Sequence, residues 1–440
     1  MQVYQKTNMD APQFSQNVLG ETINQSLLSL GLGSKEDLTS IIESAKEGLL
    51  NLCTHVGLMV VEQMMEQELT EKIGPKGQHD PNRQAYRNGY EEGSVVLGGC
   101  KHAIRRPRAR MLEEDTEVKL ETYNHFNDEE PLSKAVLAQI IYGVSCRNYA
   151  KTLNGLDAKP EVKDVSKSAV SRRFIQATST ALEQLMNRPL DDMQIVAMYI
   201  DGVGFGREHL ITAAIGLDIL GHKHILGIWE GATENKTVCA DLLTNLLERG
   251  LKIDNGILTI IDGSKALAAA IKTVFGSLAL IQRCQIHKQR NILDYLPEKE
   301  HEAMKTLLKE AFSDPNPEQG QQKLLTEAAR IEKKHPGAAA SIREGLDEMF
   351  TVARLGLDGN LIRTLTNTNV IESAFSMIRS YSRNVKNWQS GEQALRWAAA
   401  GALLAEERFN RVKGYKELQS LSLKISQYLG IETTDQVTTA

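Results

Sequence analysis

Two strand-like apolar runs, each ending at an Asp-Gly pair, dominate the hydrophobic pattern in the middle of the chain. The first, IVAMYIDG, ends on Asp201-Gly202, and the second, ILTIIDG, ends on Asp262-Gly263. Short continuous apolar runs are typical of buried strands. A carboxylate that follows such a strand places a hard oxygen ligand at the edge of a sheet. We therefore expect the two carboxylates to lie near one divalent cation.

Further strands and helices are predicted around these two runs. The segments HLITAAIGLD, HILGIW and LALIQ are strand-like, whereas KTVCADLLTNLLERGL and KALAAAIKTVF have helical periodicity. Together they predict an α/β segment over residues 191–283.

The N-terminal pattern is helical after a polar start. Residues 1–33 have little periodicity and are expected to form a loose tail. Within residues 34–74, apolar positions predict one helix with Ser34 as N-cap and an apolar face over Leu38–Leu52, and a second over Val56–Leu69. Two interpretations remain open. The helices form an internal hairpin, or their apolar faces form a self-association surface.

Residues 75–190 combine a Gly-rich loop or hairpin, QAYRNGYEEGS, with a basic run, KHAIRRPRAR. Pro107 excludes a continuous helix there, which predicts an extended basic arm suited to DNA phosphates or a narrow minor groove. The alternative is a solvated basic face balanced by the acidic EEDTEVKLE that follows. The arginines concerned are Arg105, Arg106, Arg108 and Arg110.

Three helical segments follow the basic run: Leu132–Tyr142, CRNYAKTL and SAVSRRFIQATSTALEQLM. A short helix, a turn and a helix whose first turns carry Ser and Arg fit a helix-turn-helix DNA reader. The last helix is expected to direct Val170, Phe174 and Ile175 inward. The outward, DNA-facing side chains are then Lys167, Ser171, Arg172 and Arg173.

The C-terminal third is expected to be helical. Charged helices over residues 284–362 predict an all-helical insertion, and residues 363–425 return to the core before a tail over 426–440. The segment TLTNTNVIESAFSMIRSYSRNVKNW has an apolar stripe and a polar stripe at helical spacing. Glu372 lies on the polar stripe of a helix whose other side can pack on a sheet.

Composition limits the functional classes. The chain has 440 residues and a net charge of -5, so two or three domains are expected and a nucleic-acid partner must be engaged by local patches. Its five cysteines are scattered, which favours a reducing cytoplasm over a disulfide scaffold. Neither a signal peptide nor a membrane span is predicted, so the expected location is cytoplasmic, at the nucleoid when bound to DNA.

Phosphodiester chemistry on DNA suits the acidic residues. Two Mg²⁺ ions about 3.5–4 Å apart stabilise the attacking and leaving oxygens, and carboxylates hold the ions. Two carboxylates on strands and one on a helix suffice, and Asp201, Asp262 and Glu372 have that distribution.

The chain resembles bacterial insertion-sequence transposases of the Mutator type, which have an RNase H-like catalytic domain. The matching motifs, in order, are RNG at Arg87–Gly89, the PRAR arm, YIDG at Tyr199–Gly202, IIDGSKAL, RCQIHKQRN, TNTNVIES and RNVKNW…RW. The resemblance implies an α/β RNase H-like core interrupted by an all-α insertion and preceded by helical and helix-turn-helix segments. It also implies a DDE triad of Asp201, Asp262 and Glu372 with two Mg²⁺ or Mn²⁺ ions, and double-stranded DNA as terminal inverted repeats and target.

Other residues near the triad are candidates for catalysis and DNA contact. Cys284-x-x-His287 lacks a second ligand pair for structural zinc, so hydrogen bonding to the scissile phosphate or a triad carboxylate is expected. Lys288 and Arg290 extend a cationic patch for a phosphate. Arg383, Trp388 and Trp397 are candidates for stacking on distorted DNA ends, although both tryptophans can equally be core residues.

Three functions remain open from the residues alone. The first is a transposase, working as a homodimer because joining two ends requires two triads and one chain carries one. The second is a metal-dependent nuclease or resolvase on the same fold. The third is a non-catalytic DNA-binding regulator whose carboxylates are turn residues. Inverted repeats bracketing the gene would favour the first.

Overall fold

The computed structural model describes residues 49–78, 84–97, 100–113, 115–128, 130–152, 162–163, 166–206, 209–231, 235–357 and 359–431. The chain divides into two compact units, Met1–Phe174 and Ile175–Ala440, and the division falls within helix α7 (Lys167–Asn187). The expected tail over residues 1–33 and most of the first predicted helix lie outside the described residues, as do residues 432–440 of the C-terminal tail.

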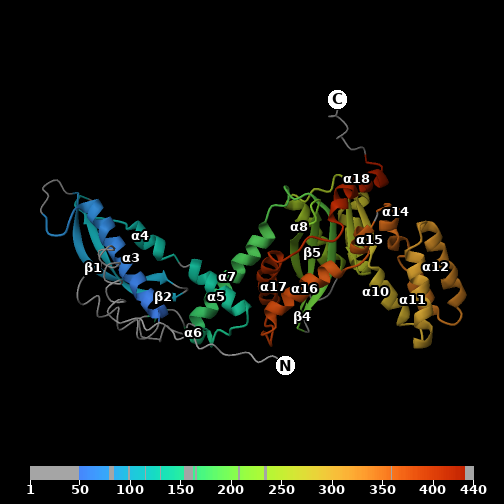
Figure 1. Ribbon diagram of the computed structural model, residues 1–440, viewed down its shortest axis with the longest axis horizontal. Helices are drawn as coiled ribbons and strands as arrows, with labels where there is room; N and C mark the ends of the chain where they lie inside the picture. Colours follow the sequence, from blue (N-terminus) through green and yellow to red (C-terminus); the bar gives the residue numbers. More distant parts are fainter. Residues whose placement is uncertain are drawn as a thin grey trace, which may run out of the picture. The chain divides into compact units, whose positions relative to one another are not determined.

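The first unit is built on a three-stranded antiparallel sheet in the order β1-β2-β3. Strands β1 (Ala85–Leu97) and β2 (Cys100–Met111) form a long hairpin, and the short β3 (Val162–Lys163) pairs with Lys101 and His102 of β2. Helix α3 (Leu49–Ile73) lies along this sheet (Figure 1). The other helices in the described part of this unit are α4 (Glu121–Phe126), α5 (Glu130–Ile141), α6 (Tyr149–Thr152) and the first turns of α7.

The apolar face of α3 packs on its own sheet. Val61, Met65 and Leu69 are buried in one cluster with Val95, Ile104, Ala109 and Leu120. The helix is continuous through residues 53–55, so the predicted break between two helices is wrong in its described part. The predicted apolar face is only partly covered, because Leu69 is buried in this cluster but Met64 is 44% exposed. The self-association surface, part of which lies outside the described residues, therefore stays a prediction.

The predicted basic arm is a strand of the hairpin. Pro107 lies opposite Tyr90, next to a register shift in β1, and a proline is tolerated in a sheet at such an irregularity. Pro107 and Ala109 are buried, and the arginines between and beside them alternate toward the other face. The hairpin part of the prediction for this segment is confirmed, whereas the free arm is not.

The predicted helix-turn-helix connection is also different. Between α6, which ends at Thr152, and α7, which begins at Lys167, lies β3 in its pairing with β2. The two helices are therefore not joined by a short turn. In α7, Val170 and Phe174 are buried as expected, but Ile175 is exposed and Arg173 is buried.

The second unit has a five-stranded mixed sheet in the order β6-β5-β4-β7-β8. Strands β4 (Ile195–Phe205), β5 (His209–Asp218) and β6 (Lys223–Gly231) are antiparallel neighbours. Strands β7 (Ile257–Ile261) and β8 (Ala279–Arg283) continue parallel to β4. All five predicted strands are confirmed, and β4 runs on through Asp201 to Phe205 instead of ending at the carboxylate.

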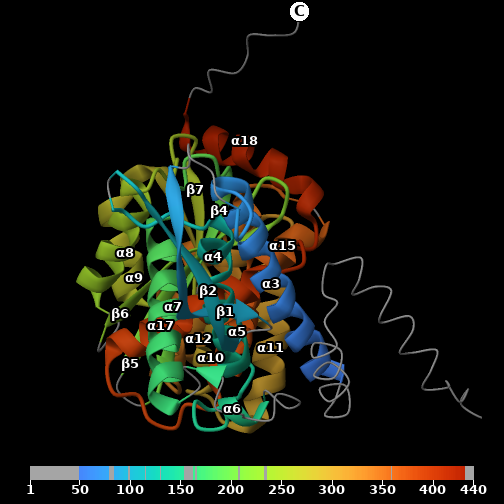
Figure 2. The ribbon, with the colours of Figure 1, turned by 90° about the vertical axis from the view of Figure 1, so that its left-hand side faces the viewer.

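Helices cover both faces of this sheet, as Figure 2 shows with α8 and α9 on one side of β4 and β7 and α15 on the other. On one face, α8 (Lys236–Glu248) and α9 (Lys265–Val274) bury their leucines against Met198, Ile200, Ile257 and Ile261. Because side chains alternate along a strand, Tyr199 and Asp201 point to the opposite face. There the Tyr199 hydroxyl donates to the Thr364 carbonyl of α15 (Gly359–Leu365).

The helices that follow β8 form a subdomain with its own core. They are α10 (Gln285–Leu293), α11 (Glu298–Phe312), α12 (Pro317–Ile331), α13 (Pro336–Arg343) and α14 (Thr351–Arg354). Leu308, Leu324, Ile342 and Phe350 lie at the centre of that core. The first two charged helices predicted after Pro297 are therefore present as α11 and α12, and their apolar stripes face one another. The third, AAASIREGLDEMFTVARL, is divided into α13, a 3₁₀ turn and α14.

The chain then returns to the sheet through α16 (Asn369–Ser382) and α17 (Gly391–Glu406) and ends in α18 (Leu418–Leu429). Helix α16 contacts β4, and α17 contacts β5 and β6. Short 3₁₀ turns lie at Gly276–Leu278, Asp347–Met349 and Tyr415–Glu417. Among the helices of the described ranges, none is long and apolar enough to cross a bilayer.

Candidate active site

The first two predicted triad residues lie side by side at one end of the sheet. Strands β4 and β7 are parallel, with Ile200 opposite Ile261, so Asp201 and Asp262 each follow a paired residue. Neighbouring strands are about 4.8 Å apart, and residues in register point to the same face. Both carboxylates are half-buried and belong to the face opposite α8 and α9.

Local backbone contacts orient the two carboxylates. Asp201 Oδ1 accepts a hydrogen bond from its neighbour's amide, Gly202 N, at 2.8 Å, and Asp262 Oδ1 accepts one from Ser264 N at 3.0 Å. Gly263 has φ = +145°, a conformation that glycine adopts without a Cβ penalty. This turn takes the chain directly from β7 into α9, whose N-cap is Ser264.

Glu372 reaches the same region from the first turn of α16. Its Oε1 accepts a hydrogen bond from Thr368 Oγ1 at 2.9 Å and lies 3.8 Å from His287 Nε2. The negative charges of Glu372 and Asp262 both help to raise the pKa of His287. His287 therefore lies within electrostatic reach of the helical and one of the strand carboxylates.

Thr368 is the hub that connects these groups, and the sequence did not single it out. Its hydroxyl is fully buried and contacts Glu372 Oε1, His287 Nδ1 at 3.2 Å and Cys284 Sγ at 3.4 Å. The only signal in the sequence was a hydroxyl residue one helical turn before Glu372. The contacts to Cys284 and His287 bring together residues more than eighty positions apart, which no local pattern reveals.

Cys284 and His287 form a coupled pair in the first turn of α10. Burial raises the pKa of the Cys284 thiol, but hydrogen bonds from His287 and Thr368 outweigh it and hold that pKa below its usual value. The hydrogen bond with Cys284 is the main cause of the raised His287 pKa, while burial acts against it. The pair therefore favours a protonated imidazole beside the carboxylates.

Backbone contacts join the segments that carry these side chains. Cys284 N donates to Ile261 O, next to Asp262, at 2.7 Å, and Gln285 N donates to Thr366 O at 2.9 Å. Tyr199, two residues before Asp201, donates to Thr364 O at 2.9 Å. Strand β4 is thus bound to the last turn of α15, and the end of β7 is linked through Cys284 and Gln285 to the segment between α15 and α16.

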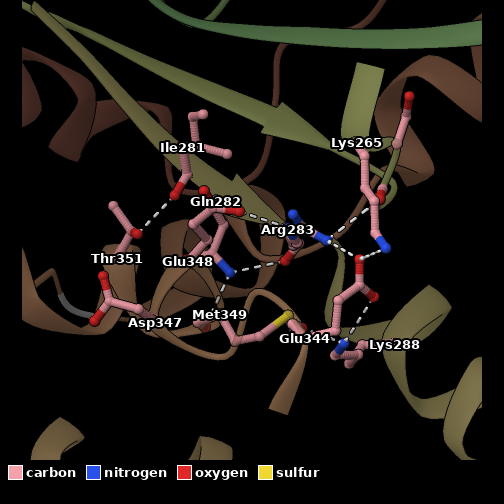
Figure 3. A network of polar contacts seen from close by, with 12 residues as sticks. Lys265, Ile281, Gln282, Arg283, Lys288, Glu344, Asp347, Glu348, Met349 and Thr351 are labelled. Carbon is pink, nitrogen blue, oxygen red and sulfur yellow. Dashed lines mark hydrogen bonds and ion pairs between the residues drawn. The ribbon is translucent and has the colours of Figure 1, made fainter. Parts of the chain in front are cut away.

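Arg283, a second residue that the sequence did not single out, ties the helical subdomain to the Asp262 turn. Figure 3 shows its guanidinium between Glu344 and Glu348, with Nε 2.6 Å from Glu348 Oε2 and Nη1 3.2 Å from Glu344 Oε1. The same Nη1 donates to Gly263 O at 3.2 Å. Gln282 reinforces the joint by donating to Met349 O and accepting from Val352 N.

The predicted cationic patch after His287 is only partly present. Lys288 is buried, donates to Glu344 O and lies 3.6 Å from Glu344 Oε2, so it serves the joint in Figure 3 and is not a surface phosphate contact. Arg290 and Arg383 are exposed. Trp397 is buried, which makes its predicted stacking on DNA wrong, while the half-buried Trp388 packs edge-on against Phe205 and Trp397.

The predicted DNA-binding cations of the first unit fall into two groups. Arg106 and Arg108 pair with Glu91 and Glu117, and Arg110 pairs with Asp115. Asp115 and Glu117 belong to EEDTEVKLE, the acidic segment that the sequence analysis gives as the alternative partner of the basic run. Arg105 is exposed and lies over the Tyr90 ring at 5.1 Å. Lys167 and Arg172 are exposed, but Arg173 is buried and is not an outward contact.

Together the fold and the site define a mixed α/β protein with acidic side chains gathered at the carboxyl ends of parallel strands. A model of the family described as "Transposase, Mutator family" matches residues 32–411. The chain belongs to the Mutator family of transposases, which confirms the resemblance seen in the motifs.

Individual relatives are similar over most of their length. The chain is 25% identical over 367 residues to the transposase for insertion sequence element ISRM5 of Rhizobium meliloti (strain 1021), covering 82% of this chain and 89% of that protein. It is 28% identical over 382 residues to the transposase for insertion sequence element IS256 in transposon Tn4001 of Staphylococcus aureus, covering 83% of this chain and 92% of that protein.

Proposed function

We propose that this protein is the transposase of an insertion sequence, and that it cuts and joins DNA strands at the element's terminal inverted repeats. The observation that carries the proposal is the placement of Asp201 and Asp262 directly after paired residues of two parallel strands, with His287 within electrostatic reach of both Glu372 and Asp262. The names of the relatives support the substrate. The strand order, with three antiparallel strands followed by two strands parallel to β4, supports an RNase H-like core.

The donor chemistry fits Mg²⁺ or Mn²⁺. All three side chains offer carboxylate oxygens, which are the ligands that hard divalent cations prefer. When bound, two such ions would stabilise the charge on the attacking and leaving oxygens of a phosphodiester. In this proposal, Asp201, Asp262 and Glu372 hold the ions. Thr368 fixes the Glu372 carboxylate, and His287, whose pKa the hydrogen bond with Cys284 raises, would donate to the phosphate.

The proposal also includes the partners. Exposed cations of the first unit, Arg105, Lys167 and Arg172, contact the DNA backbone, and Arg290 and Arg383 do so beside the site. A homodimer is the working unit, because joining two ends requires two active sites and one chain carries one triad.

The test is strand cleavage by conservative variants. Asp201→Asn, Asp262→Asn or Glu372→Gln each removes a charged ligand with little change of volume, so each is expected to abolish Mg²⁺-dependent cleavage of terminal-repeat DNA while binding is retained. Asp254→Asn is the matched control. Asp254 is exposed and precedes the first residue of β7, at the end of the strand opposite to Asp262. A triad variant that cleaves at a near-normal rate would remove that residue from the site.

A further inference from the structure

The turn between β5 and β6 carries a second set of potential metal ligands. Asp218 Oδ2 lies 2.9 Å from His222 Nδ1 and 3.0 Å from His224 Nε2. Among the residues that the structure describes, these are the one set of three His, Cys, Asp or Glu side chains whose ligand atoms all lie within 4.8 Å of one another. We propose that Asp218, His222 and His224 bind a divalent transition-metal ion of the zinc class.

The turn holds the three side chains in place without using their ligand atoms. Asp218 Oδ1 accepts hydrogen bonds from Leu220 N at 2.9 Å and His222 N at 2.8 Å, so Oδ2 alone faces the two imidazoles. Gly221 has φ = +82°, and a Cβ there would lie 2.3 Å from Tyr415 Cβ. The backbone of the turn is therefore fixed from both sides, which lowers the entropy lost when an ion binds.

The donor set selects the class of ion. Two imidazoles and one carboxylate suit zinc, at about 2.0–2.1 Å from each ligand atom, whereas Mg²⁺ prefers oxygen. Asp218 carries the negative charge that such an ion needs. Burial raises the pKa of Asp218, but hydrogen bonds from His224 and His222 outweigh it and leave that pKa below its usual value. The His222 side chain is half-exposed, which leaves room for water as a fourth ligand.

The surroundings of the two imidazoles differ, and this difference gives a specific expectation. Glu406 Oε1 lies 3.7 Å from His224 Nδ1, too far for a hydrogen bond but on the side where a carboxylate partner accepts the second ring proton of a metal-bound imidazole. Arg411 Nε instead donates to His222 Nε2 at 2.9 Å. If Nδ1 of His222 binds the ion, its proton is released to solvent and Nε2 takes one up. Arg411 must then give up its hydrogen bond.

This site is separate from the triad. Asp218 pairs with Ile195 at the start of β4, whereas Asp201 pairs with Ala213. Five residues of β5 at about 3.4 Å each place the two ends about 17 Å apart. One ion cannot serve both sites, so the inference stands whether or not the proposed transposition chemistry is correct.

The experiment uses full-length, untagged protein carrying Asp201→Asn and Asp262→Asn, so that the triad does not compete for the probe. Co²⁺ is titrated into the chelator-treated protein, and both the heat of binding and the visible absorption of four-coordinate Co²⁺ are recorded. The expected result is one equivalent per chain, displaced by Zn²⁺ and not by excess Mg²⁺. Absence of binding would overturn the proposal.

Variants locate the ion. His222→Ala and His224→Ala are expected to abolish Co²⁺ binding. Asp218→Asn keeps an oxygen acceptor for the turn but loses the charged ligand, so it should weaken binding by at least 10-fold with an unchanged circular-dichroism spectrum. His209→Ala is the matched control, because His209 also pairs with a carboxylate, Glu230, and no third ligand joins them among the residues that the structure describes. Binding that survives His222→Ala would place the ion elsewhere.

Arg411 supplies a readout that a purely structural turn would not show. Arg411→Gln replaces a donor with a side chain whose oxygen can accept the Nε2 proton of metal-bound His222. It should therefore tighten Co²⁺ binding by about 10-fold, which is the smaller of the changes in affinity produced by hydrogen-bond partners of metal ligands. Arg411→Lys retains charge and donor character and should leave the affinity unchanged. Equal affinities for the Gln and Lys variants would contradict ligation through His222 Nδ1.

Discussion

At the scale of single residues, the Thr368 hydroxyl holds the candidate active site together. It has one proton to donate and lies within contact distance of a carboxylate, an imidazole and a thiol. Because it is fully buried, water cannot replace it. Without it, Glu372 is free to rotate away from the position that the first turn of α16 gives it.

Thr368→Val removes the hydroxyl and keeps the shape, so we expect it to lower both Mn²⁺ affinity and DNA cleavage by roughly 10- to 100-fold, as loss of a partner behind a metal ligand does. Thr368→Ser keeps the hydroxyl and should retain most of both. Mn²⁺ binding measured by calorimetry without DNA separates this effect from turnover. Equal losses in the Val and Ser variants would assign Thr368 a packing role only.

At the scale of elements, the joint between the helical subdomain and the sheet rests on Arg283. Its side chain is 9% exposed and pairs with Glu348 at 15% and Glu344 at 38%. Arg283→Met removes one partner of Glu348, which keeps Lys272, and one partner of Glu344, so we expect a loss of about 2 kcal/mol in the free energy of unfolding, measured by urea denaturation. Arg343→Met is the control, because its pair with Glu332 is solvent-exposed and should matter far less. Equal losses of unfolding free energy in the two variants would show that the buried ion pairs of Arg283 stabilise the protein no more than an exposed pair does.

The elements that the sequence predicted correctly are those whose pattern is locally complete. Strand β4 up to Ile200 and the whole of β7 are buried at every position, and parallel pairing then places Asp201 beside Asp262. Strand β2 was predicted to be a free basic arm because a strand pairing with β1 leaves no local signal in the sequence. Its arginines also made the run look polar, although Pro107 and Ala109 between them are buried. Arg173 was misplaced for a related reason, since helical periodicity of apolar residues says nothing about a buried cation. Thr368 and Arg283 depend on contacts across the fold, which no spacing shows.

At the scale of the whole molecule, DNA affinity depends on which cations remain uncompensated on the surface. Arg106, Arg108 and Arg110 already face carboxylates of their own unit, so a phosphate would have to compete with Glu91, Glu117 or Asp115. Arg105 stacks on an exposed Tyr90, and Arg172 is exposed in the first turns of α7. The negative net charge makes such local contacts decisive.

We therefore expect Arg105→Gln and Arg172→Gln in the full-length protein each to weaken binding to terminal-repeat DNA and to lower the slope of log affinity against log salt by about 0.9, the value for one lost phosphate contact on B-DNA. Arg108→Gln should change the slope much less, because Glu117 already neutralises the charge of Arg108 in the free protein. Fluorescence anisotropy across a series of salt concentrations measures all three variants against the same duplex. The assignment would be reversed if Arg108→Gln lowered the slope by about 0.9 and Arg105→Gln left the slope unchanged. The DNA would then lie on the paired arginines of β2.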